Sequence, residues 1–248
     1  MKDFDSKLVL VTGAASGIGR ATAMRFSGQR ADLILVDINE EGLESTAGEI
    51  DARGGRAAWY RTDPREVDQV EEAGLEDWRW IIEPNLWSCI YTVHFFLPDM
   101  MQRRSGHVIN VASGVGLFAV PYQAPYNTSK HAVVGLTESI RQEMERYGIG
   151  ASVVCPGMIR TPIINTVRSI GFGDSVKKMA HRLASPPEKM ADAIIRGVKK
   201  NRAVIMYPLY INLLYGLKRF SPRAADKLSK TVARDFYRAR RSRQRRQT

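Results

Sequence analysis

Residues 8–19 read LVLVTGAASGIG, an apolar run followed at once by a glycine-rich loop. Four consecutive apolar residues, 8–11, are typical of a strand that is buried on both faces of a parallel sheet. Glycines let the loop turn tightly, let the backbone approach a pyrophosphate and let the next helix pack on the sheet. We expect that helix over residues 20–29, with its first N–H groups directed at the phosphates. The loop residues that this pattern assigns to cofactor binding are Gly13, Ser16, Gly17, Ile18 and Gly19.

A second apolar run, residues 33–36, ends in Asp37. A carboxylate at this place hydrogen-bonds the ribose hydroxyls and repels a 2'-phosphate, which favours NAD over NADP. The alternative interpretation of Asp37 is a helix-capping or loop residue. Residues 40–53 then read as a helix stopped by two glycines, and residues 57–60 as a third strand that ends near Asp63.

Length and composition favour one α/β domain. A chain of 248 residues with 44% hydrophobic residues can bury a substantial core. Its start carries acids and no apolar run, so we expect neither a secretory signal nor a transit peptide, and no segment approaches the length of a membrane span. Cys89 and Cys155 lack the spacing of a redox pair, which favours reduced thiols in a cytoplasmic protein. We expect no metal site.

The net charge of +11 belongs to the C-terminal end of the chain. Residues 218–248 hold twelve Lys or Arg and two Asp, whereas the rest is nearly neutral with 25 basic and 24 acidic residues. We therefore expect one domain over residues 1–217 and a basic tail over residues 218–248.

A long helical pattern over residues 125–147 opens with Tyr126 and Lys130. Residues four apart project from the same face of a helix. The pKa of a free tyrosine is about 10, too high for a base at neutral pH, and a neighbouring ammonium lowers it by stabilising the phenolate. The pair therefore suits proton transfer to or from an oxygen, although the same spacing is also common on a solvated helix face.

Five motifs occur in the order typical of one protein family. Through them the chain resembles the short-chain dehydrogenases/reductases over most of residues 7–162. Ser113 lies thirteen residues before Tyr126, as the family pattern requires. The motifs that carry the resemblance are Thr12-Gly13-x-x-x-Gly17-Ile18-Gly19, Asn85 in Pro84-Asn85-Leu86-Trp87-Ser88, Ser113 in Asn110-Val111-Ala112-Ser113, Tyr126-x-x-x-Lys130 and Pro156-Gly157-Met158-Ile159-Arg160-Thr161.

The resemblance implies a Rossmann-like, doubly wound parallel sheet flanked by helices, and an alcohol dehydrogenase or ketoreductase that uses NAD, with NADP less favoured. It implies that Ser113 holds the substrate oxygen beside Tyr126, the general acid/base. Lys130 would lower the pKa of Tyr126 and bind the nicotinamide ribose, and Asn85 would position a water of a proton relay. The remaining implied cofactor contacts are Tyr126 itself, Asp63 to the adenine, Thr161 to the carboxamide, and Pro156, Gly157 and Ile159 in the turn beside the nicotinamide. The resemblance also implies that this chain forms a homodimer or homotetramer, with the Tyr126 helix helping to form an interface.

One departure from the family lies between Asp63 and Asn85. The usual pattern has a helix, a fourth strand ending in an Asn-Asn-Ala-Gly motif and a loop there, whereas this chain offers only a short helix over residues 64–73. About thirty residues, on the order of one strand and its connection, are missing. Either a segment is absent from a longer functional sequence, or the chain is a degenerate member that binds cofactor weakly or not at all.

Residues 162–185 are where family members place a substrate lid. Apolar residues there and nearby suggest a hydrophobic pocket for a lipophilic alcohol or ketone, although such residues are more often plain packing. They are Ile163, Ile164, Ile170 and Phe172, with Leu117, Phe118 and Met158.

After the lid, Ser185-Pro186-Pro187-Glu188 reads as a capping box that starts a helix ending near residue 200, and residues 203–207 as the last strand. Residues 208–217 are uncharged, contain Tyr210, Leu213, Leu214 and Tyr215, and lead directly into the basic tail. Aromatic and aliphatic residues beside clustered Lys and Arg suit a helix on an anionic membrane surface. A solvated tail, a protein partner and, less favoured, nucleic acid remain alternatives.

The sequence therefore predicts an α/β enzyme that interconverts an alcohol and its ketone or aldehyde. The competing interpretation is a catalytically silent Rossmann-like protein that acts through its basic tail.

Overall fold

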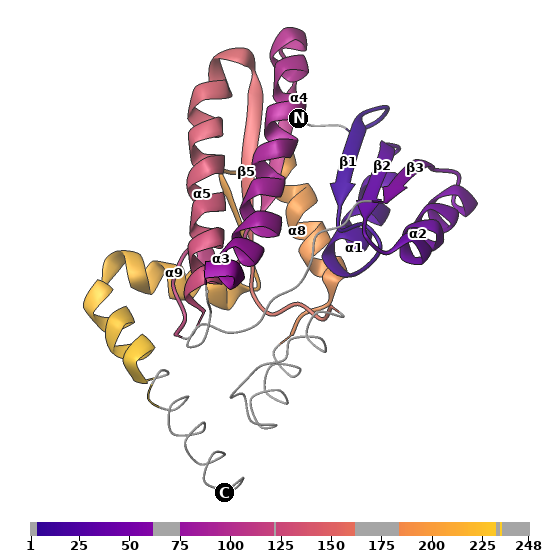
Figure 1. Ribbon diagram of the computed structural model, residues 1–248. Coiled ribbons are helices and arrows are strands. Elements are labelled where there is room, and N and C mark those ends of the chain that lie inside the picture. The colour runs from indigo at the N-terminus through magenta and orange to yellow at the C-terminus, as the bar shows by residue number, and fades with distance from the viewer. Residues whose placement is uncertain (1–3, 62–74, 122, 162–183, 232–233, 235–248) are drawn as a thin grey trace, which may run out of the picture.

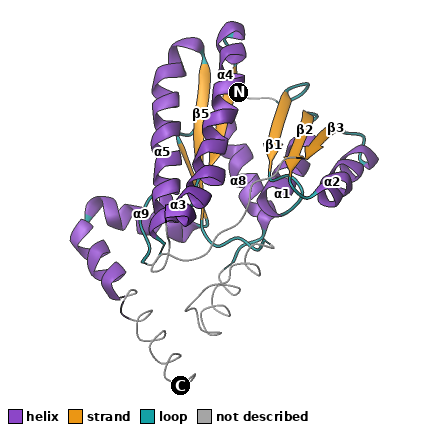
Figure 2. Ribbon diagram, viewed as in Figure 1, coloured by secondary structure: helices purple, strands orange, loops and turns teal. Residues whose placement is uncertain are grey.

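The computed structural model describes residues 4–61, 75–121, 123–161, 184–231 and 234 (Figures 1 and 2). The elements are β1 (Leu8–Thr12), α1 (Gly17–Ser27), β2 (Asp32–Asp37), α2 (Glu40–Ala52), β3 (Arg56–Arg61), α3 (Leu75–Ile82), a π-helical turn η1 (Glu83–Trp87), α4 (Ser88–Arg103), β4 (Gly106–Val111), η2 (Gly114–Gly116), α5 (Ala124–Met144), η3 (Glu145–Tyr147), β5 (Ile149–Pro156), α8 (Pro187–Lys199), β6 (Val204–Tyr207) and α9 (Leu209–Phe220).

The strands form two parallel half-sheets rather than one continuous sheet. Strands β1, β2 and β3 pair in that order, and so do β4, β5 and β6. Figure 1 shows the halves side by side, with β1–β3 separated from the half that contains β5. Among the described residues, no strand pairs with the free edge of β1 or of β4. The expectation of an α/β fold of parallel strands flanked by helices, without the family's fourth strand, is thus confirmed.

The second half-sheet is covered on both faces. Helix α5 packs against one face through Val133 and Val134, which contact Val153 and Cys155 of β5. Helix α8 packs against the other, where Ile194 and Val198 share a cluster with Val154. Since successive side chains of a strand point to opposite faces, both faces of β5 are apolar and nearly every residue of the strand is buried.

The first half-sheet is covered on one face only. Leu33 and Leu35 of β2 are buried under α1 and α2, whereas Leu8 of β1 is 69% exposed and Tyr60 of β3 is exposed. The expectation that the run at residues 8–11 is buried on both faces is therefore wrong. A strand acquires two buried faces only when it has a neighbour and a helix layer on each side, and β1 lies at an open edge.

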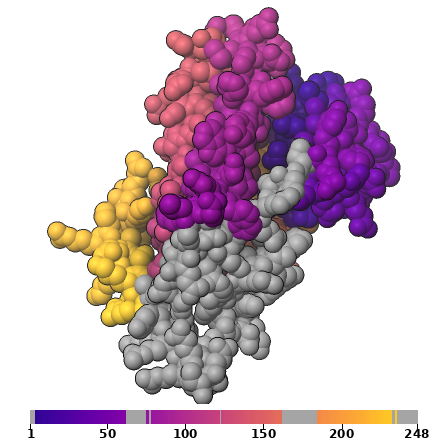
Figure 3. Space-filling view, viewed as in Figure 1, coloured from indigo at the N-terminus to yellow at the C-terminus, as the bar shows by residue number. Residues whose placement is uncertain are grey.

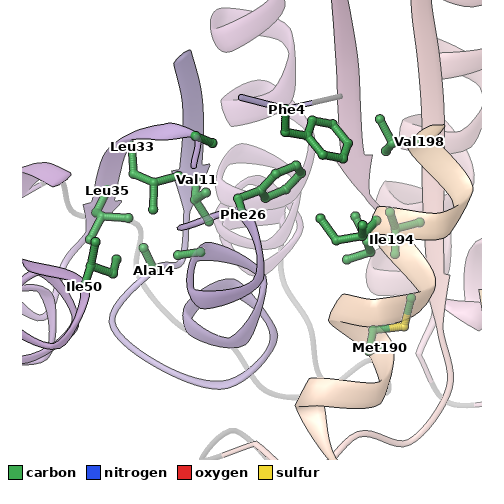
Figure 4. Packing of buried hydrophobic residues seen from close by; sticks show 14 of the residues in the cluster. Phe4, Val11, Ala14, Phe26, Leu33, Leu35, Ile50, Met190, Ile194 and Val198 are labelled. Carbon is green, nitrogen blue, oxygen red and sulfur yellow. The ribbon is translucent and has the colours of Figure 1, made fainter. Parts of the chain in front are cut away.

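An apolar core joins the two halves. Helices α1 and α8 pack along one another, and Phe4 and Phe26 from the first half share one cluster with Met190, Ile194 and Val198 of α8 (Figure 4). The rings of Phe4 and Phe26 meet edge to face with centroids 4.9 Å apart. Non-directional hydrophobic burial therefore holds together what strand hydrogen bonds hold in a continuous sheet.

Most element positions agree with the sequence prediction, with two differences. Helix α1 begins at Gly17 instead of residue 20. The expected capping box before α8 is wrong, because Pro186 is the N-cap residue and no side chain caps the helix. Ser185 instead bridges Ile159, donating its N–H to the Met158 carbonyl and accepting from the Arg160 N–H. Helix α9 runs through the expected domain boundary at residue 217, so that boundary stays a prediction.

Within the described part of the chain, no helix is both long and apolar enough to cross a membrane.

His107 gives the fold a dependence on pH. Its Nε2 lies 2.8 Å from Ser152 Oγ, and that hydroxyl donates to the Arg202 carbonyl at 2.6 Å, so Nε2 is the donor to Oγ. Burial, with positive charge nearby including Arg141, lowers the pKa of His107 to about 4 from its usual 6.5. The native imidazole is therefore neutral across a range in which the unfolded chain binds a proton.

We expect the free energy of unfolding to be unaffected by His107 above pH 6.5 and to fall as pH drops from 6.5 to about 4. The loss over this window is on the order of 2–3 kcal/mol. His107→Gln should flatten the window in urea unfolding measured at several pH values, while substitution of the exposed His94 by Gln should leave it in place. An unchanged slope in His107→Gln would contradict this account.

Candidate active site

Ser113, Tyr126 and Lys130 come together beside the end of β4. Ser113 follows that strand as the N-cap of η2, where its hydroxyl accepts from the Val115 N–H, and its side chain lies near Tyr126 from the first turn of α5. The Lys130 ammonium lies 5.7 Å from the centre of the Tyr126 ring and donates to the Val111 carbonyl at 3.4 Å. The close pairing of η2 with α5 requires a glycine, since a Cβ on Gly116 would lie 2.6 Å from the Lys130 carbonyl oxygen.

The electrostatics of this cluster differ from the sequence expectation. Burial raises the pKa of Tyr126, opposed by the hydrogen bond with Ser113, instead of Lys130 lowering it. Burial also lowers the pKa of Lys130, opposed by the neighbouring thiols Cys89 and Cys155. Removal of both side chains from water disfavours their charged forms. Tyr126 is therefore a neutral hydrogen-bond donor, the form that gives a proton to a carbonyl oxygen.

Asn85 lies in the π-helical turn η1 between α3 and α4, next to α5. The Asn85 side-chain amide donates to the Ile81 carbonyl at 2.9 Å, and the Cys89 thiol donates to the Asn85 backbone carbonyl at 3.7 Å. A π turn adds a residue to the helix and shifts carbonyl groups out of the regular ladder, which is why such turns recur at functional sites. The turn is a feature that a regular helical pattern in the sequence does not reveal.

The glycine-rich loop connects β1 to α1 on the first half-sheet. Gly13 and Gly17 have φ of 67° and 55°, in the left-handed region that favours glycine. A Cβ on Gly19 would lie 1.9 Å from the Gly13 carbonyl oxygen, so only glycine fits there. Ser16, the N-cap residue, makes no side-chain cap, and the first N–H groups of α1 point out of the helix end. The loop thus fits a phosphate group, while the Ile18 side chain packs against the core.

Asp37, at the end of β2, holds this loop. One carboxylate oxygen accepts from the Ala15 N–H at 3.0 Å and the other from the Asn39 N–H at 3.0 Å. Within the chain, the Asp37 carboxylate therefore makes the contacts of a loop residue, the alternative interpretation given above. Its expected contact with a ribose stays a prediction.

The turn after β5 lies against the glycine-rich loop. A Cβ built on Gly17 would lie 2.7 Å from Thr161 Cγ2, so residues 144 positions apart in the chain meet there. Pro156 ends β5 and Gly157 follows it, whereas the Ile159 side chain is buried in the core cluster. A cofactor contact at Ile159 would therefore fall to its backbone.

Tyr210 of α9 contacts this turn, a role that sequence reasoning missed. The sequence places it in a stretch that suits a membrane surface, a solvated tail or a partner. Its hydroxyl instead accepts from the Met158 N–H at 2.6 Å, and a Cβ on Gly157 would lie 2.3 Å from it. Only the contact across the fold reveals this role, because the sequence separation gives no signal.

The remaining site residues lie outside the described residues. These are Asp63, the expected helix at residues 64–73, and Ile163, Ile164, Ile170 and Phe172 of the expected lid. Of the other pocket residues, Leu117 is buried, Phe118 half-buried and Met158 exposed. Among described residues, no group of His, Cys, Asp and Glu could hold a metal ion.

Comparisons with known proteins identify the family. The family model for short chain dehydrogenases matches two overlapping segments, residues 7–74 and 65–170. The chain is 32% identical to 17-beta-hydroxysteroid dehydrogenase 13 of Mus musculus over 246 residues, covering 86% of this chain and 77% of that protein.

Two solved structures are similar in fold and sequence. A short-chain dehydrogenase/reductase from Burkholderia phymatum in complex with NAD has a TM-score of 0.77 and 25% identity, covering 88% of this chain and 95% of that chain. An actinorhodin polyketide ketoreductase with NADPH has a TM-score of 0.72 and 26% identity, covering 83% and 97%.

Asp37 offers a test of the loop geometry. Asp37→Ala leaves the N–H groups of Ala15 and Asn39 without their acceptors, so we expect a loss of about 1–2 kcal/mol in the free energy of unfolding. Asp226→Ala is the matched control, because it removes an exposed carboxylate whose partner is Lys230 on the same helix. Equal stability of the two variants in urea unfolding would show that the Asp37 contacts do not hold the loop.

Proposed function

The chain belongs to the short-chain dehydrogenase family of oxidoreductases, and from this premise we propose that it interconverts an alcohol and its ketone or aldehyde with a nicotinamide dinucleotide. The observation that carries the proposal is that the Ser113 side chain lies near enough to Tyr126 to influence the pKa of its phenol, with Lys130 on the same face of α5. A hydroxyl pair of this kind positions an oxygen atom and exchanges a proton with it.

The residues divide the proton transfer between them. The Ser113 hydroxyl holds the substrate oxygen, and the Tyr126 phenol gives its proton to a carbonyl oxygen or, as phenolate, takes one from an alcohol. Lys130 stabilises the phenolate so formed, and Asn85 positions a water through which the proton is restored from solvent. A bound dinucleotide supplies the hydride donor or acceptor.

The cofactor is proposed to be NAD. Gly13, Ser16, Gly17, Ile18 and Gly19 would hold the pyrophosphate, Asp37 the ribose, and Thr161 the carboxamide beside Pro156, Gly157 and Ile159. The Asp37 carboxylate retains lone pairs beyond its two backbone contacts, and its negative charge disfavours a 2'-phosphate.

The substrate is proposed to be lipophilic. The exposed Met158 and the half-buried Phe118 lie by the turn and by η2, on the side of the site that Ser113 occupies. The similarity to a hydroxysteroid dehydrogenase supports an apolar alcohol of some size. A homodimer or homotetramer is also proposed, since Tyr91 and Phe95 of α4 project into solvent one helical turn apart beside α5.

The split sheet favours a second candidate, a catalytically silent protein that acts through its basic tail. The two matched family segments overlap at residues 65–74, and among the described residues no strand joins β1 to β4. We propose instead that the site is functional, because all four proton-transfer residues belong to the intact half. An intact mass above that of this sequence, with extra residues after Ala73, would show that the functional chain carries the missing strand.

Tyr126→Phe is the test of the mechanism. Removal of the phenolic hydroxyl should reduce kcat/KM for a lipophilic secondary alcohol by about a hundredfold to ten-thousandfold, the usual contribution of a general acid/base. Leu75→Asp, an exposed residue on α3, should leave turnover unchanged. Undiminished turnover in Tyr126→Phe would remove Tyr126 from the mechanism.

Cofactor binding separates the two candidate functions. NADH should raise the melting temperature of the purified chain, because ligand that binds only the native state stabilises it, and NADPH should raise it less. A larger shift with NADPH would overturn the role of Asp37. No shift with either, from a folded protein, would support the silent candidate.

A further inference from the structure

Helix α9 connects the active site to the basic tail. Its inner face is buried through Ile211, which is 2% exposed and touches Gly114, and through Tyr210 against the Met158 turn. At its far end the Lys218 ammonium donates to the Leu117 carbonyl at 2.7 Å. The helix is therefore fixed to the residues beside Ser113.

The outer face of α9 is an apolar stripe of Leu209, Leu213 and Phe220. These side chains are 70%, 66% and 88% exposed. Their spacing of four and seven residues places them on one side of a helix, and Gly216 between them has only open space beyond it. Leu214 and Tyr215 of the same uncharged stretch are half-buried and do not belong to the stripe. Exposure of three large apolar side chains along one line has no benefit for an isolated chain in water.

Positive charge follows this stripe at its C-terminal end. Arg219 lies in the last turn of α9, and residues 222–231 form a further helical stretch with Arg223, Lys227 and Lys230 exposed. Residues 218–248 carry twelve basic residues against two acidic ones. Figure 3 shows the described part of this segment protruding at the side of the molecule.

We infer that the apolar stripe of α9 lies in the interface of a membrane rich in anionic lipids, with the basic segment against the headgroups. Leucine and phenylalanine enter the acyl boundary while Lys and Arg meet the negative surface. A second copy of the chain fits less well, because pairing through this face brings two strongly positive segments together. Nucleic acid uses the charge but leaves the stripe in water.

The inference rests on the proposed function and extends it to the origin of the substrate. Since the inner face of α9 touches Gly114 and the Met158 turn, docking of the outer face would leave only this helix between Ser113 and the membrane surface. A lipophilic alcohol would then pass from the bilayer to Ser113 without crossing water.

Sedimentation with vesicles tests the inference on the full chain. We expect the protein to sediment with vesicles of phosphatidylcholine and phosphatidylserine at low salt, and to dissociate at high salt or from phosphatidylcholine alone. Leu213→Asp and, separately, Phe220→Asp should weaken vesicle binding about tenfold or more, because each replaces buried apolar area by a charge. Leu75→Asp, an 80% exposed leucine on α3, is the matched control and should bind like the wild type.

Three outcomes would overturn the inference. The first is no sedimentation of the wild type with phosphatidylserine vesicles at low salt. The second is unchanged vesicle binding by both Leu213→Asp and Phe220→Asp, together with loss of binding in the double variant Arg223→Glu, Lys227→Glu. That result would show that binding depends on charge and not on the apolar stripe. The third is a change of oligomeric state in Leu213→Asp without a change in vesicle binding.

The Tyr126→Phe variant separates this inference from the proposed function. It should bind vesicles like the wild type, because Tyr126 belongs to helix α5 and not to the outer face of α9. Vesicle binding without turnover in the wild type would support the membrane-binding inference and contradict the proposed enzymatic function.

Discussion

The packing of α1 against α8 is the contact on which the rest of the structure depends. Within the described residues no hydrogen-bonded strand connects β1 to β4, so the cluster of Phe26 with Ile194 and Val198 is what sets the halves in place. The contact of Gly17 with Thr161 follows from that packing, because Gly17 is the first residue of α1. A hydrophobic interface fixes position less sharply than a ladder of strand hydrogen bonds, since burial has no preferred direction.

The two kinds of site chemistry are therefore held in different ways. Ser113, Tyr126, Lys130 and Asn85 all belong to the half built on β4–β6, whose central strand β5 is covered on both faces. The glycine-rich loop and Asp37 belong to the other half, which is covered on one face. The proton-transfer groups thus share a rigid frame, whereas the distance from them to the phosphate loop depends on the joint between the halves.

Sequence reasoning succeeded where the signal is local or where motif spacing is strict. It placed the strands, the helix of Tyr126 and Lys130, and the absence of a strand before Asn85 in the part of the chain that the structure describes. It failed where an outcome depends on surroundings. One-sided burial of β1, the raised pKa of Tyr126 and the contact of Tyr210 with Met158 each depend on which distant groups exclude water. Short-range pattern carries none of that information.

Among the described residues, no strand covers the outer edges of β1 and β4, and this bears on the behaviour of the protein in concentrated solution. Backbone N–H and C=O groups along such an edge are templates for any extended segment that reaches them, and Leu8 presents an apolar side chain next to them. A strand offered by a neighbouring molecule satisfies these groups as well as an internal one does. Solubility and the tendency to aggregate are thus set by the same gap that divides the sheet.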